Sequence, residues 1–244
     1  MNANRLKHLL LLCILLTSVK GIRAQVTLQT CIDIGKNNVS EGFFAKNMFR
    51  GSYQYRKITG EAGMQFALIS NNPNIFSGFY ITGSREFSVR NFPFNVKGFF
   101  IENRFSDILH ETNWGLRVET RKYEHFIFEL GTNNKTYIIN SSAREEYDID
   151  KSDSKLSENF NLIYTVSAYL KPRTNRWNAG VSCTNIDYFL VNQSTNPVFN
   201  IQMSYKLKSN LSIHLDSWYQ RAGMLNINAN HFGYFFRGGI KWEI

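Results

Sequence analysis

No apolar run in this 244-residue chain approaches the ~20 residues that a membrane-spanning helix needs. Cysteine is scarce, and its three residues cannot build a disulfide framework, although one bond between Cys31 and Cys183 stays possible in an oxidising compartment. Basic residues outnumber acidic ones by 28 to 19 but form no cluster on a recognition helix, so nucleic-acid binding is not expected. No segment keeps a 3.6-residue apolar stripe, so we expect no amphipathic helix. If the chain enters a membrane, it must do so as a closed barrel.

The first residues have the layout of a secretory signal peptide. Two basic residues precede the short apolar run 9–16, and a more polar stretch ends on the small residue Ala24. We expect cleavage after Ala24, with cleavage after Gly21 as the alternative. This predicts a signal peptide over 1–24 and one domain over 25–244. Removal takes four basic residues and no acidic one, which lowers the net charge from +9 to +5.

Apolar side chains recur at every second position in most of the remaining chain, as in strands with one apolar face. The clearest stripes cover these ranges: 26–34, 62–68, 114–118, 126–130, 162–170, 199–207 and 211–215. Two other segments, 75–87 and 94–105, break phase once near glycines, as a β-bulge would. Compact turn signals separate the stripes, for example "TGE" at 59–61, and a longer polar connection covers 147–158.

The pattern predicts an all-β fold, namely a single antiparallel up-and-down transmembrane β-barrel of about twelve strands, with ten to fourteen allowed. A literal reading gives thirteen strands, whereas bacterial barrels of this type have even numbers. The segment 42–58 is therefore interpreted as one strand with a bulge rather than two, or the stretch after Lys135 as holding an extra one.

Alternation alone does not separate a membrane barrel from a soluble one, but three features favour lipid outside. Export gives access to an outer membrane, and aromatic residues make up 15% of the chain. Several aromatic residues lie near predicted strand ends, where interface girdles place them: Tyr53, Tyr55, Trp114, Tyr123, Trp177, Trp218 and Trp242. The polar faces carry opposite charges that could pair across neighbouring strands inside the barrel, and we predict that these residues face the lumen: Arg117, Glu119, Glu129, Arg237, Lys241 and Glu243.

The sequence finishes on "HFGYFFRGGIKWEI", a strand with one apolar face and one mostly polar face. The apolar face, which we expect to meet lipid, consists of Phe232, Tyr234, Phe236, Ile240, Trp242 and Ile244. We expect this strand to close the barrel against the first strand, near 26–34. Together with the signal peptide, the start at "AQ" and the meander of strands, it resembles small outer-membrane β-barrel proteins of the Bacteroidota.

The resemblance implies an outer-membrane location and no assigned activity. In such proteins the last strand is the recognition signal for the barrel-assembly machinery and usually ends in an aromatic residue. This chain departs from that pattern because it ends in Ile244, with Trp242 two positions earlier. Expected partners are outer-membrane lipid, lipopolysaccharide and, during biogenesis, the assembly machinery, with no cofactor and no metal.

One constellation could carry chemistry. Ser212, His214 and Asp216 lie on one face of one predicted strand, and a serine nucleophile with a histidine base and an acid could hydrolyse acyl esters. Residues i and i+2 on a strand are ~6.6 Å apart, however, and the His-x-Ser-Asn type motif of lipid A acyl hydrolases is absent. The leading hypothesis is therefore a barrel without catalysis, acting as a narrow pore or as a structural or interaction component of the envelope. The alternatives are the acyl hydrolase and a soluble periplasmic barrel that binds an apolar ligand.

Overall fold

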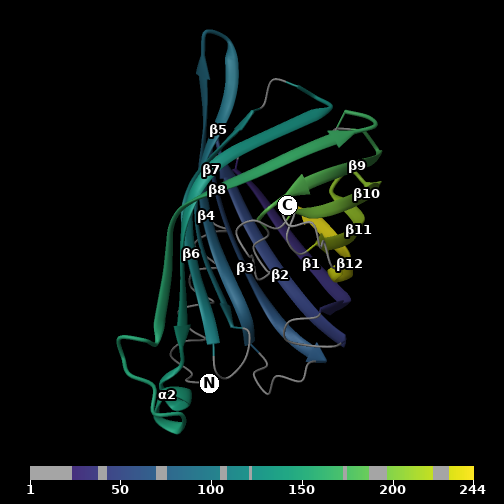
Figure 1. Cartoon of the computed structure of the whole chain (residues 1–244). Coiled ribbons are helices and arrows are strands. Elements are labelled where there is room, and N and C mark those ends of the chain that lie inside the picture. Colours follow the sequence, from purple (N-terminus) through teal and green to yellow (C-terminus); the bar gives the residue numbers. More distant parts are fainter. Residues whose placement is uncertain are drawn as a thin grey trace, which may run out of the picture.

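Twelve antiparallel strands form a closed barrel in the computed structural model (Figure 1), which confirms the predicted fold class. The structure describes residues 24–37, 43–69, 76–104, 109–120, 123–172, 175–186, 197–221 and 231–244. Within them, the elements are β1 (Ala24–Asn37), β2 (Phe43–Tyr55), β3 (Ile58–Ile69), β4 (Phe76–Val89), β5 (Phe92–Arg104), β6 (Leu109–Thr120), β7 (Phe126–Ile139), α2 (Ser141–Glu146), β8 (Lys155–Tyr169), β9 (Trp177–Thr184), β10 (Val198–Lys208), β11 (Leu211–Arg221) and β12 (His231–Glu243). Apart from Ala24, the predicted signal peptide (1–24) lies outside the described residues.

Each strand pairs with the next along the chain, and β12 returns to pair with β1, as predicted. The register of that closing pair runs from Thr27 opposite Glu243 to Asn37 opposite Gly233. The described part of segment 42–58 is the single strand β2, followed by a turn at Arg56, where φ is 53°. The bulge expected in this strand is not in β2: it pairs with β1 without a shift, and its shift against β3 leaves Leu68 of β3 as the extra residue. The turn predicted at 59–61 is wrong, because these residues belong to β3 and pair with β2 and β4.

One of the two predicted bulges is present. In β4, Gly78 pairs with Gln65 and Phe76 pairs with Phe66, so that Ser77 is the extra residue. The bulge predicted in 94–105 is wrong where the segment is described, since β5 pairs with β4 without a shift. The phase breaks there because Phe99 and Ile101 are apolar residues that point inward and are buried.

One helix was not expected from the sequence. Helix α2 has six residues and buries only Ala143, so it is too short to show an apolar stripe. No helix in the described ranges is both long and apolar enough to cross a membrane.

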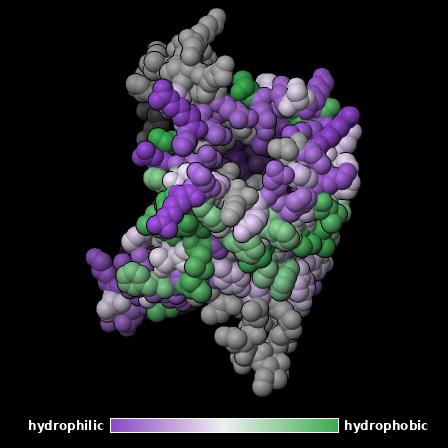
Figure 2. Space-filling view, turned by 90° about the horizontal axis from the view of Figure 1, so that it is seen from above, coloured by the Kyte–Doolittle hydropathy of each residue, from purple (hydrophilic) through white to green (hydrophobic). Residues whose placement is uncertain are grey.

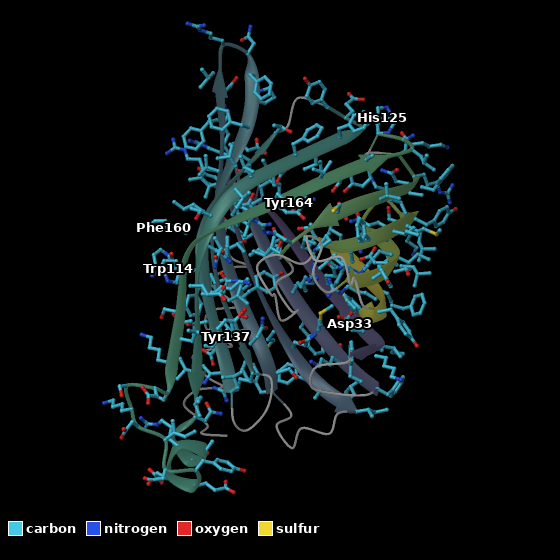
Figure 3. All side chains as sticks on the ribbon, viewed as in Figure 1. Asp33, Trp114, His125, Tyr137, Phe160 and Tyr164 are labelled. Carbon is cyan, nitrogen blue, oxygen red and sulfur yellow. The ribbon has the colours of Figure 1, made fainter. Side chains whose placement is uncertain are left out.

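The barrel is polar inside and apolar outside. On β6, Leu116 is 60% exposed whereas its neighbour Arg117 is 7% exposed, and the same alternation runs around the wall. Seen from above, hydrophilic side chains gather around the central hollow and hydrophobic ones on the outer flank (Figure 2). Trp114 projects from the outer wall while Asp33 lies inside (Figure 3). A soluble barrel would show the opposite arrangement.

The two ends of the barrel differ in their connections. One end, called the terminal end, holds Ala24 and Glu243 together with two-residue turns between β2 and β3, β4 and β5, and β10 and β11. The other end, called the α2 end, holds the 15-residue connection 140–154 with α2 and the 13-residue connection 185–197.

Candidate functional site

The pair β1 and β12, called the closing seam, carries charges of alternating sign on its inner side together with the neighbouring strands. Arg237 of β12 lies opposite Asp33 of β1 and opposite Asp216 of β11, and Asp33 lies opposite Lys46 of β2. Arg237 donates from Nε to Oδ1 and from Nη2 to Oδ2 of Asp33, at 2.9 and 3.0 Å. Both side chains are almost fully buried. A bidentate arginine–carboxylate pair of this kind is strong and fixes its geometry.

A second charged network lines the facing wall, on β5, β6 and β7. Arg117 Nη1 donates to Glu129 Oε2 at 2.9 Å. Lys97 Nζ lies 3.7 Å from Glu119 Oε2 and 3.5 Å from Glu129 Oε1. Two cations and two carboxylates therefore neutralise one another, as buried charges require.

Residues of the two walls line one cavity. Its volume is about 270 Å³, and it is lined by Arg50, Arg117, Ile186, Gln202, Asp216, Trp218 and Arg237. These residues include members of β6 and β12, which are six strands apart in either direction around the barrel. A second cavity of about 380 Å³ shares Arg50, Gln202 and Asp216 with the first. Together the two cavities form a polar space inside the barrel. Side chains from the two facing walls project into this space and make it narrow.

Aromatic rings inside the barrel hold one arginine of this cavity. Trp218 stacks on Phe235 with ring centroids 5.4 Å apart and 7° between the planes. The Arg237 guanidinium lies 5.2 Å from the Trp218 ring and 5.4 Å from the Phe235 ring. Cation–π contact adds to the ion pair with Asp33 and restricts the guanidinium further. The expectation that Trp218 belongs to an outer aromatic girdle is wrong, because this residue is buried in the interior.

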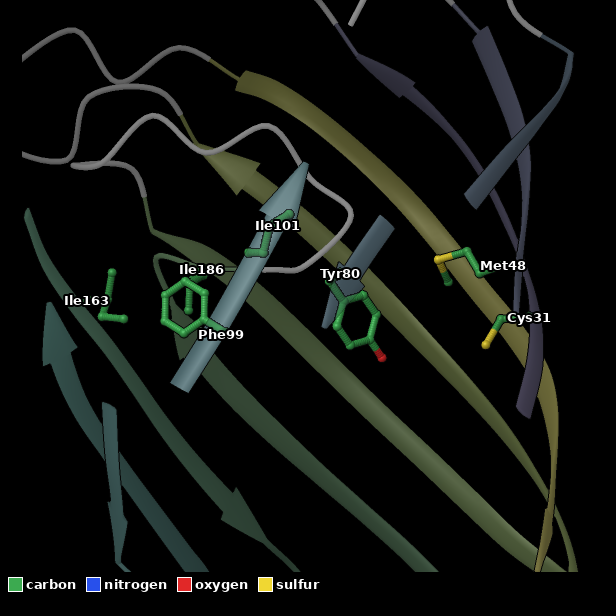
Figure 4. Packing of buried hydrophobic residues seen from close by; sticks show 7 residues of the cluster. All are labelled: Cys31, Met48, Tyr80, Phe99, Ile101, Ile163 and Ile186. Carbon is green, nitrogen blue, oxygen red and sulfur yellow. The ribbon is translucent and has the colours of Figure 1, made fainter. Parts of the chain in front are cut away.

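An apolar cluster also occupies the interior (Figure 4) and consists of Cys31, Met48, Tyr80, Phe99, Ile101, Ile163 and Ile186. Ile186 differs from the other members because it follows β9 instead of lying on a strand. The preceding residue, Asn185, accepts a hydrogen bond from Tyr164 N and donates one to Leu162 O, each at 2.8 Å. These bonds continue the edge of β8 beyond the last paired residue of β9 and direct Ile186 inward.

Replacing Asn185 by alanine is expected to lower the free energy of unfolding by about 1–3 kcal/mol, because two backbone groups of β8 lose their partners. The measurement is denaturant unfolding in detergent together with hydrogen exchange at the Tyr164 amide, which should speed up. Asn175→Ala, on the exposed connection before β9, is the matched control and should change neither. Equal responses of the two variants would contradict the role given to the Asn185 side chain.

The residues predicted for the lumen occupy two levels of the interior. Arg117, Glu119, Glu129 and Arg237 lie deep inside, in the networks described above. Lys241 and Glu243 pair with each other at 2.7 Å near the terminal end and are partly exposed. The described side chains of the predicted apolar face of β12 lie on the outer side, between 43% and 61% exposed: Tyr234, Phe236, Ile240, Trp242 and Ile244. The side chain of Phe232 lies outside what the structure describes.

The structure does not gather the proposed hydrolase residues around a common point. Ser212, His214 and Asp216 occupy every second position of β11 and so lie in a row along its inner face. The His214 Nε2 atom contacts Gln29 Nε2 at 2.9 Å and Cys31 Sγ at 3.4 Å. Cys31 and Cys183 are free thiols in this structure.

Several interior residues were not predicted from the sequence. Asp33 and Arg50 lie on the faces opposite the apolar stripes, and their parity is a signal that could have found them. Phe235 has the parity of Arg237, which places it on the inner face although it is apolar. Ile186 carries no such signal, because it lies outside the strands.

Many solved structures share this architecture, among them two porins. No protein-family model matches the chain, and no curated protein matches it. The KdgM porin, in a complex with disordered oligogalacturonate, is 10% identical with a TM-score of 0.51, covering 88% of this chain and 98% of its own. The NanC porin is 11% identical with a TM-score of 0.50, covering 88% of this chain and all of its own. At these identities the likeness shows the fold alone, which is that of outer-membrane β-barrels.

Proposed function

We propose that this protein is a narrow, non-catalytic pore of the outer membrane for small polar solutes. The observation that supports it best is the shared cavity, in which Arg117 of one wall and Arg237 of the facing wall line the same polar space. Because the second cavity adjoins it through Arg50, Gln202 and Asp216, a solute could move between them past fixed polar groups.

The length of the connections supports one orientation. Membrane barrels of bacteria have short periplasmic turns and longer extracellular loops. The terminal end would therefore face the periplasm and the α2 end the exterior. In the membrane the exposed side chains of β12 meet lipid. The strand serves as the assembly signal that the Bacteroidota resemblance implies.

The charges in the shared cavity support passage without strong selection by sign. Arg117 and Arg237 are each held by a carboxylate at 2.9 Å, from Glu129 and Asp33 respectively. The other two charged residues of the lining, Arg50 and Asp216, are of opposite sign. The net field of these groups along the pore is therefore small compared with that of unpaired arginines. The oligogalacturonate belongs to the KdgM complex, and we do not extend it to this chain.

Single-channel recording in planar bilayers tests the pore. Purified protein is expected to give small, discrete conductance steps. Gln202→Trp is expected to reduce the step several-fold, because Gln202 lines both cavities and a larger side chain would obstruct the space that they share.

Ile201→Trp is the matched control, since this neighbouring side chain of β10 is exposed on the outer face. It should leave the conductance unchanged. Absence of any conductance in the unmodified protein would overturn the proposal and favour a structural role. An unchanged step in Gln202→Trp would show that ions do not pass between the two cavities.

A further inference from the structure

A second polar cleft lies at the α2 end, between the strand ends and the connection that contains α2. Its volume is about 760 Å³, and the charged or titratable residues that line it are Glu102, Arg104, His110, Arg144, Lys151 and Lys155. Four of these are permanent cations and one is a carboxylate. The lining of the cleft thus has three more cations than carboxylates. The lining of the shared cavity has two more, and there Arg117 and Arg237 are in addition paired with carboxylates.

The charged residues of β5 that line this cleft, and His110 of β6, belong to the outer face of the wall. Arg104 and Glu102 flank Asn103, which points inward and is 3% exposed. His110 likewise precedes Glu111, which points inward and is 1% exposed. Since successive side chains of a strand point to opposite faces, Glu102, Arg104 and His110 lie outside the barrel. The cleft also shares no lining residue with either interior cavity. The cleft is therefore separate from the pore that we propose.

An aromatic band runs around the same outer face just below the cleft. Neighbouring rings lie 5.9 to 6.4 Å apart across β2 to β5, in the order Phe49, Phe66, Phe76, Phe79 and Phe100. The Arg104 guanidinium lies 5.3 Å from the Phe76 ring. The cations of the cleft therefore adjoin the band on the side of the α2 end. Aromatic girdles of membrane barrels lie at the membrane–water interface. The cleft would then lie at the level of the lipid head groups.

We propose that this cleft binds the phosphate groups of the glycolipid that forms the outer leaflet. Arginine and lysine donate charge-assisted hydrogen bonds to phosphate, and clustered cations beside a membrane surface attract anionic head groups. Glu102 accepts from Arg104 at 3.3 Å and so orients this guanidinium at the edge of the aromatic band. The proposal rests on the outer-membrane location and on the orientation proposed above, and not on conduction.

Native mass spectrometry of the barrel released from nanodiscs tests this site. The nanodiscs contain zwitterionic phospholipid with a minor fraction of bisphosphorylated lipid A, and bound lipid A is counted for each barrel. The double variant Lys151→Glu/Lys155→Glu is expected to weaken lipid A retention about tenfold or more, since each lost charge-assisted hydrogen bond contributes on that order. Both lysines are exposed, so the variant should keep its heat-modifiable mobility on gels.

The matched control is Lys57→Glu/Lys208→Glu, which reverses two exposed lysines at the terminal end. It should retain lipid A like the unmodified protein. Equal losses in both double variants, or equal binding of dephosphorylated lipid A, would overturn the proposal. Displacement of lipid A by millimolar inorganic phosphate would also overturn it, in favour of a site for soluble anions. Conductance should be normal in the cleft variant, so failure here is distinguishable from failure of the pore.

Discussion

Replacing Arg237 by leucine is expected to lower the free energy of unfolding by about 3–5 kcal/mol, the usual result of breaking a buried ion pair by removing one partner. The substitution leaves Asp33 buried without the guanidinium that holds both of its oxygens. It also removes the cation that lies opposite Asp216 on β11. The measurement is the temperature at which the folded band disappears on unheated gels, or denaturant unfolding in detergent.

Lys241→Leu on the same strand is the matched control. Its pair with Glu243 is partly exposed, and exposed ion pairs contribute below about 1 kcal/mol. A double variant in which Asp33 also becomes leucine should recover part of the loss, because the buried carboxylate is removed together with the guanidinium that it binds. If Arg237→Leu and Lys241→Leu unfold alike, the seam does not depend on the buried pair.

Gly239→Ala is expected to impair closure of the barrel, lowering the free energy of unfolding by about 1–3 kcal/mol or more, as overpacking does. A Cβ atom on Gly239 would collide with the backbone oxygen of Thr30, and it would lie 2.7 Å from His214 Cε1 and 2.9 Å from Cys31 Cα. Backbone atoms of a paired strand cannot move aside without lengthening the ladder hydrogen bonds. The yield of heat-modifiable barrel in the outer membrane measures the effect.

The preceding residue provides the control for this prediction. A Cβ atom on Gly238 would meet only Leu215 Cδ1, at 3.8 Å, which is ordinary contact. Gly238→Ala should therefore fold as well as the unmodified chain. Normal yield of the Gly239 variant would show that β1 and β12 can separate at this point without loss.

The alternation of side chains predicted the strands and the wall, but not the contents of the interior. Leu116 and Arg117 illustrate the success, since parity alone assigned them to opposite faces and the structure buries only the arginine. Tyr80 and Phe99 illustrate the failure, because they are apolar residues that point inward and so blur the alternation. Which inward residues meet across the barrel depends on its closure and strand stagger, and neither can be read from one strand at a time.

The residues of the candidate site were also predicted only in part. Arg117 and Glu129 lie on adjacent predicted strands, and their pairing follows from a local hairpin. Arg237 was assigned to the interior without its partner, because Asp33 is 204 positions away in the chain. The outer cleft was not predicted, since its cations come from β5, β8 and the connection around α2, which the sequence presents only as a polar stretch.

The closing pair of strands also has a consequence for how the barrel forms. Its contacts join the two ends of the described chain, so they have the highest sequence separation in the molecule and cannot form early. Until β12 arrives, β1 and β11 each present an unpaired edge, which hydrocarbon cannot hydrogen-bond and which invites pairing with another chain. The buried charge of Asp33 likewise has no guanidinium at that stage. The last step of barrel formation should therefore be nearly all-or-none. A chain that stalls before this step should remain an open sheet that is prone to aggregate.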